Sequence, residues 1–201
     1  MNTIHIALDI ETLSKRPTAA IISIAAKCFT FAENTGEMPL DAFFKTVNAS
    51  TCVMYGLHFD MDTVSWWQKQ SEEAKRVHLQ HGDIAVTISQ ALLALREYYL
   101  KACKLMEPIG QRPLVWCQGT DFDIPILRNA YQTVLGTDAP WSHGDVRDSR
   151  TFVHAIAGLV HPTVTDPYSL IPHNPDWHPH DALSDCDQLI WNVRHISRLV
   201  R

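Results

Sequence analysis

Three short segments of this chain carry acidic side chains at spacings that could hold a metal ion. In the first, Asp9 and Glu11 are separated by one residue within a stretch of alternating apolar and polar residues. Residues i and i+2 of a β-strand point to the same face, so both carboxylates would project together while Ile10 points into the core. Two such carboxylates raise each other's pKa unless a cation neutralises them, and hard divalent cations prefer oxygen ligands. The pair predicts either a metal site or a solvated strand end that carries two acids.

The other two segments each lie just before or at the start of a predicted helix. Asp123 follows a short apolar run, at the position where ligand sites gather in α/β sheets, and is either a ligand or the N-cap of the helix. Anchoring of Phe122 in the core would turn Asp121 away from such a site. His180 precedes the last predicted helix and Asp185 lies in its first turns. The alternatives there are an exposed histidine and an acid that stabilises a helix N-terminus.

Together the three segments supply four carboxylates and one histidine, a set that fits two-metal phosphodiester hydrolysis. Two divalent cations about 4 Å apart stabilise the attacking and leaving oxygens in such reactions. The histidine would accept a proton from the attacking water. The formal net charge of −5 does not favour a partner bound by broad phosphate neutralisation. Bound cations would offset that charge where it matters, at the site.

The elements predicted around these residues describe a single α/β domain over residues 1–201. The predicted strands are residues 4–9, 20–31, 43–47 and 114–117, with a turn at 34–36. The predicted helices are residues 63–70 with Asp62 as N-cap, a turn or helix from Ser71, a long helix from Asp83 to Tyr99, one from Pro125 to Gly136, and one over 182–199. This order favours a mixed central β-sheet flanked by α-helices. Residues 161–179, rich in proline, predict a loop beside the site that substrate orders or moves.

Composition excludes several classes of protein. Hydrophobic residues at 46% and charged residues at 19% exclude a wholly disordered chain. The five cysteines are odd in number and have no CxxC spacing, which favours a reducing compartment, the cytoplasm. The N-terminal sequence does not resemble a signal peptide, and the longest apolar stretch, 19–26, is too short to span a bilayer. We therefore expect no membrane partner, and a homodimer is an open alternative because exposed tryptophans would suit an interface.

The sequences LDIET, GTDFD and HDALSD resemble the three exonuclease motifs of the DEDDh 3′–5′ exonucleases, which have a ribonuclease H-like fold. Residues 8–13 with 20–24, and Ser65-Trp66-Trp67, resemble a narrower branch that holds phage-type exonucleases and ribonuclease AS-like exoribonucleases. One departure is Cys186, where we expect a small alanine. The resemblance implies two Mg²⁺ or Mn²⁺ ions and a histidine general base. By it, the metal ligands are Asp9, Glu11, Asp123 and Asp185, the general base is His180, and the contacts to the 3′-terminal nucleotide are Thr12 and Leu13, the latter as an apolar wedge.

We expect a 3′–5′ exonuclease that releases nucleoside monophosphates from single-stranded ends, with RNA slightly favoured over DNA through the narrower resemblance. The alternatives are a DNA proofreading or repair exonuclease, a non-catalytic nucleic-acid-binding module on the same fold, and a phosphodiesterase of small nucleotides. Trp66 and Trp67 lie about 100° apart on a helix, so one is expected in the core and the other, Trp66, is a candidate for stacking on a base. Basic residues that could contact phosphates are Lys15, Arg16, Arg147 and Arg150.

Overall fold

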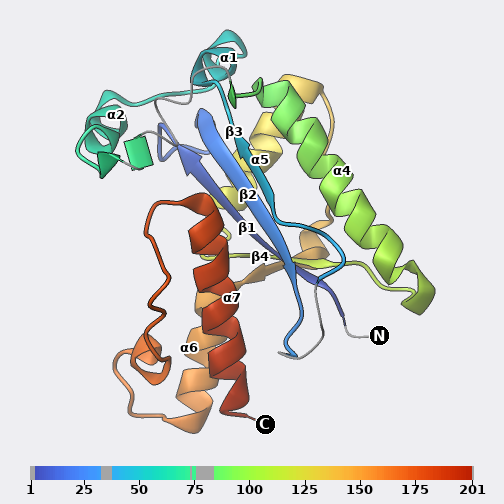
Figure 1. Ribbon diagram of the computed structural model, residues 1–201, viewed down its shortest axis with the longest axis vertical. Helices are drawn as coiled ribbons and strands as arrows, with labels where there is room; N and C mark the ends of the chain where they lie inside the picture. The colour runs from blue at the N-terminus through green and yellow to red at the C-terminus, as the bar shows by residue number, and fades with distance from the viewer. Residues whose placement is uncertain (1–2, 33–37, 73, 76–83, 201) are drawn as a thin grey trace.

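A five-stranded mixed sheet forms the centre of the computed structural model, which describes residues 3–32, 38–72, 74–75 and 84–200 (Figure 1). The strand order is β3-β2-β1-β4-β5. The strands are β1 (His5–Thr12), β2 (Ile21–Phe29), β3 (Phe43–Thr46), β4 (Leu114–Cys117) and β5 (Val146–Asp148). β2 runs antiparallel to β1 and β3, whereas β1, β4 and β5 are parallel. The C-terminal ends of β1, β4 and β5 therefore meet at one edge of the sheet.

Helices cover both faces of this sheet (Figure 1). On one face lie α4 (Ile88–Met106) and α5 (Asp123–Ala130), and on the other α6 (Ser149–Val160) and α7 (Ala182–Arg198). α1 (Ala49–Met54) and α2 (Met61–Trp67) lie beyond one end of the strands. The shorter turns are η2 (Glu107–Ile109), η3 (Tyr131–Leu135), η4 (His143–Asp145) and η5 (Pro167–Leu170). The predicted mixed sheet flanked by helices is confirmed.

The alternation of residues along β1 decides which side chains reach the active-site face. Ile6, Leu8 and Ile10 belong to the larger core cluster, which α4 and α5 cover. Ala7 points the other way and packs in the smaller cluster beneath α7. Because side chains alternate along a strand, Asp9 and Glu11 continue the row of Ala7 toward the C-terminal edge.

Two predicted helix starts are wrong. α2 is capped by Asp60, whose side chain accepts from the Asp62 backbone N–H, and the helix ends at Trp67. The Asp60 N–H donates to the carbonyl of Leu13 (2.8 Å), which holds residue 60 in the extended conformation that a cap needs. α4 begins at Ile88 after the N-cap Thr87, which forms a reciprocal capping box with Gln90.

Some elements escape prediction or lie outside the described residues. β5 and α6 are not predicted, because a three-residue edge strand carries almost no periodicity. Residues 161–179, predicted as a loop, contain the 3₁₀ turn η5. The turn at 34–36, the proposed cap Asp83 and most of the segment after Ser71 lie outside the described residues. No helix in the described part of the chain is long and apolar enough to cross a membrane.

Candidate active site

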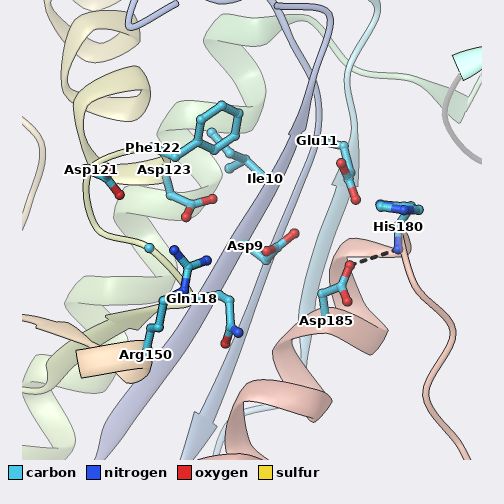
Figure 2. Close-up of a pocket in the computed structure, with 11 residues that line it drawn as sticks. Asp9, Ile10, Glu11, Gln118, Asp121, Phe122, Asp123, Arg150, His180 and Asp185 are labelled. Atoms are coloured by element: carbon cyan, nitrogen blue, oxygen red, sulfur yellow. Dashed lines mark hydrogen bonds between the residues drawn. The ribbon is translucent and has the colours of Figure 1, made fainter. Parts of the chain in front are cut away.

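Three carboxylates from two elements converge at the C-terminal edge of the sheet. Asp9 and Glu11 come from β1, and Asp185 comes from the first turn of α7, which packs across β1 and β2. One ligand atom from each of the three lies within 4.8 Å of the others. Figure 2 shows Glu11 and Asp185 on one side of Asp9. Oxygen atoms at this spacing are a donor set that suits a hard divalent cation.

Asp123 approaches the same point from the opposite face of the sheet (Figure 2). It is the first residue of α5, only 5% exposed, and its carboxylate accepts the backbone N–H of Ile10. That hydrogen bond places its carboxylate beside Asp9. Phe122 packs against the larger core cluster, while Asp121 is exposed and points away in Figure 2. The prediction that Phe122 separates the two acids is confirmed.

His180 lines the same cavity as the four acids, whose volume is about 290 Å³. Its backbone N–H donates to Oδ2 of Asp185 (3.0 Å), the bond drawn in Figure 2. Its ring meets the ring of Trp66 edge-on, with centroids 4.8 Å apart and planes at 87°. Its φ of 63° lies in the left-handed region, which costs a non-glycine residue about 1–2 kcal/mol. Strain of this kind gathers at functional sites, where the surrounding contacts sustain it.

A second cavity of about 510 Å³ adjoins the acids, since Glu11 lines both. Thr12 and Trp66 line its wall, and Trp66 is 40% exposed. Trp67 is the core member of the pair, as predicted, and its Nε1–H donates to the carbonyl of Thr12 (2.9 Å). Leu13 is only 8% exposed and packs in the larger core cluster. Its role as a wedge stays a prediction.

Sequence reasoning missed two residues of the site and left a third unassigned. Gln118, just after β4, lines the acidic cavity, and so does Arg150 of α6. In the sequence Arg150 is only one of four candidate basic residues, because α6 is not predicted. Trp177 donates its indole N–H to Oδ1 of Asp185 (2.7 Å). No feature of its sequence neighbourhood marks Trp177 apart from the other tryptophans.

Burial and mutual repulsion raise the pKa values of the acids. Burial is the larger cause for each, and neighbouring carboxylates add to it. The pKa of Glu11 rises to about 8 and that of Asp123 to about 7, while the pKa values of Asp9 and Asp185 also lie above their ordinary range. Converging acids that resist ionisation together fit a site that a divalent cation completes, because the cation supplies the missing positive charge.

Comparison with known proteins decides the family. Residues 4–197 match the model of the 3′-5′ exoribonuclease Rv2179c-like domain. The chain belongs to this family. The resemblance to the DEDDh 3′–5′ exonucleases is thereby confirmed, as is the enzyme class that it implies. A relative of the family member described here is an exodeoxyribonuclease of Enterobacteria phage T4, which is 23% identical over 95% of this chain and 88% of the phage protein.

Solved exonuclease structures share the fold of this family member. Cell-death related nuclease 4 (CRN-4) superposes with a TM-score of 0.61 at 13% identity, over 98% of this chain and 64% of that one. E. coli exonuclease I in a zinc-bound complex with single-stranded DNA superposes with a TM-score of 0.54 at 15% identity, over 94% of this chain and 39% of that one. The chain thus spans less than two thirds of either structure.

The acids of this family member should make its metal-free form less stable as pH rises. A carboxyl whose pKa is raised on folding stabilises the fold fully below its unfolded value. That contribution is lost as pH rises through the folded value, about 8 for Glu11 and about 7 for Asp123. In EDTA at pH 8, Glu11→Gln is therefore expected to raise the free energy of unfolding by about 1–3 kcal/mol. At pH 4 it should change little. Thermal melts detect this at about 2–4 °C per kcal/mol.

Glu107→Gln, at an exposed position on η2, is the control and should change neither melt. His5 has the opposite pH effect, because burial lowers its pKa to about 4, so its contribution is lost as pH falls from 6.5 toward 4. His5 is present in every variant and cancels from the comparison. A Glu11→Gln gain of the same size at pH 4 and pH 8 would show that carboxylate repulsion is not its cause.

Proposed function

We propose that the protein is a metal-dependent 3′–5′ exonuclease that hydrolyses single-stranded nucleic acid, RNA in preference to DNA, to nucleoside monophosphates. The observation that carries the proposal is the convergence of Asp9, Glu11, Asp123, His180 and Asp185 on one cavity. A protein that only bound nucleic acid would gain nothing from four buried or half-buried carboxylates, whose repulsion opposes folding.

The four carboxylates are proposed to hold two divalent cations, Mg²⁺ or Mn²⁺. When bound, such cations stabilise the charge that develops on the oxygens of a phosphodiester under attack. Asp9 lies between Asp123 on one side and Glu11 with Asp185 on the other, so its carboxylate faces both halves of the site (Figure 2). His180, on the solvent side of Glu11 and Asp185, is proposed to accept the proton of the attacking water.

The larger cavity beside the acids is proposed to receive the 3′-terminal nucleotide. Thr12 and Trp66 line it, and Leu13 lies directly behind Thr12 in the chain. A base stacked on a tryptophan gains about 1–3 kcal/mol. Arg150 lies in the acidic cavity on the side opposite His180 (Figure 2). A guanidinium there is suited to a phosphate oxygen, which the carboxylates alone would repel.

Degradation of DNA is the second candidate function. The family description is that of an exoribonuclease, whereas the phage T4 relative is named an exodeoxyribonuclease. The E. coli exonuclease I structure is a complex with single-stranded DNA. Recognition of the 2′-hydroxyl distinguishes the two sugars, and the contact that would provide it forms only with substrate present.

The deciding experiment follows matched RNA and DNA oligonucleotides, labelled at the 5′ end, in Mg²⁺ and in Mn²⁺. We expect a ladder that shortens from the 3′ end, nucleoside monophosphates as products, and faster loss of RNA. Asp9→Asn, which keeps the size of the side chain, is the inactive control. Faster loss of DNA would establish the second candidate, and binding without cleavage would leave only a binding module. Cleavage of dinucleotides alone would indicate a phosphodiesterase of small substrates.

A further inference from the structure

Residues 172–180, which we call the strap, run beside α7 and reach its N-terminus just before the active site (Figure 1). The α7 residues that bind the strap are spaced so that they form one stripe along the helix. Hydrogen bonds from strap to helix or helix to strap join Trp191 to Pro172, Asn174 to Gln188, Trp177 to Asp185, His178 to Ser184, and His180 to Asp185. The strap is thus fixed on α7 at intervals along its length.

Two of these hydrogen bonds are made by indole N–H groups but have different acceptors. At the far end of the strap, Nε1–H of Trp191 donates to the carbonyl of Pro172 (2.8 Å). At the active-site end, Nε1–H of Trp177 donates to Oδ1 of Asp185 (2.7 Å). Both bonds hold the strap on the helix. Only the bond from Trp177 ends on a carboxylate that faces the acidic cavity.

The Asp185 carboxylate is held at both of its oxygen atoms. Oδ1 accepts from Trp177, and Oδ2 accepts from the backbone N–H of His180 (3.0 Å). Each carboxylate oxygen has two lone pairs, so one hydrogen bond at each oxygen leaves room for a cation. The two donors therefore fix the rotation of the carboxylate without using up its capacity as a ligand.

We propose that Trp177 is a positioning residue that orients Asp185 as a metal ligand. This inference rests on the proposed function, in which Asp185 binds a divalent cation. Hydrogen-bond partners of ligating carboxylates set their orientation, and loss of such a partner costs about 10–100-fold in metal affinity or activity. Without the indole N–H, the backbone N–H of His180 would alone hold the carboxylate, from a residue whose own conformation is left-handed. Trp177 itself touches neither substrate nor the reacting atoms in this role.

The test compares Trp177→Phe with Trp191→Phe. Each change removes one indole N–H and keeps an aromatic ring, and each removes one bond between strap and helix. Mn²⁺ affinity is measured by isothermal titration calorimetry without substrate, and kcat and KM are measured with a single-stranded oligonucleotide. We expect Trp177→Phe to weaken Mn²⁺ binding about 10–100-fold, to lower kcat at limiting Mn²⁺, and to leave KM unchanged. Excess Mn²⁺ should restore kcat, and Trp191→Phe should match the wild type.

The outcomes separate this inference from the proposed function. Absence of Mn²⁺ binding or cleavage by the wild type would reject the proposed function. Wild-type Mn²⁺ affinity in Trp177→Phe would reject the inference alone. Equal losses in Trp177→Phe and Trp191→Phe would also reject it, because attachment of the strap would then explain both. Trp177→His, which keeps a ring N–H, is the second variant. It should lose less affinity than Trp177→Phe, and an equal loss in the two would count against the hydrogen bond.

Discussion

EDTA should abolish cleavage of a 3′-labelled or 5′-labelled oligonucleotide, and added Mg²⁺ or Mn²⁺ should restore it. The physical reason is the donor set, in which carboxylate oxygens of Asp9, Glu11 and Asp185 converge within 4.8 Å and Asp123 faces them across β1. At neutral pH these groups repel one another, and their pKa values are raised accordingly. A divalent cation removes that repulsion and supplies the positive charge that an attacked phosphodiester requires.

Among single variants of the acids, Asp9→Ala should lose the most activity, about 10³-fold or more, because several kcal/mol of transition-state stabilisation depend on the cations. Asp9 is central to the site, whereas Asp185 lies at its edge on α7 (Figure 2). Asp185→Ala should therefore recover part of its activity in excess Mn²⁺, and Asp9→Ala should not. Initial rates across a Mn²⁺ titration measure both. Undiminished cleavage in EDTA would be incompatible with the proposed mechanism.

His180→Ala should lower kcat by about 10²–10⁴-fold, the usual cost of removing a general base. The side chain lies beside Glu11 and Asp185, at the mouth of the acidic cavity, with its ring against Trp66. Its loss should leave Mn²⁺ affinity intact, so excess Mn²⁺ should not rescue the variant. That behaviour distinguishes it from Asp185→Ala in the same titration. The wild-type rate should rise with pH across roughly 6 to 7.5, where histidine side chains ordinarily lose their proton, and the variant should lose that rise.

His178→Ala is the matched control for His180→Ala. His178 lies two positions earlier on the strap, is exposed, and is tied to α7 through its backbone N–H, which any residue except proline retains. The control should keep wild-type turnover and its pH dependence. Turnover near the wild-type value in His180→Ala would overturn the assignment, and His178 would then be the next candidate for the base.

Periodicity in the sequence was enough to predict the parts of the site that belong to a single element. Alternation along residues 4–11 placed Asp9 and Glu11 on one face and Ile10 in the core, as the structure has them. The 100° step of a helix required one of Trp66 and Trp67 to be buried. These predictions succeed because the directions of neighbouring side chains on one strand or helix follow from local backbone geometry.

Helix starts were less predictable, because several side chains could serve as caps. Asp60 and Asp62 both precede or open α2, and both are good N-cap residues. The backbone of residue 60 is held extended by its hydrogen bond to Leu13 at the end of β1, and this tertiary contact selects Asp60. The sequence alone does not contain that choice.

The sequence by itself determined the chemistry of this protein: which acids and which histidine are present, and which of them share a strand face or a helix turn. Only the tertiary structure decided how segments from distant parts of the chain meet. Packing of α7 across β1 brings Asp185 to Asp9, the strap brings Trp177 to Asp185, and α6 brings Arg150 into the acidic cavity. Such contacts depend on the packing of whole helices against both faces of the sheet. No local repeat in the sequence encodes them, because the partners are neighbours in space and not in the chain.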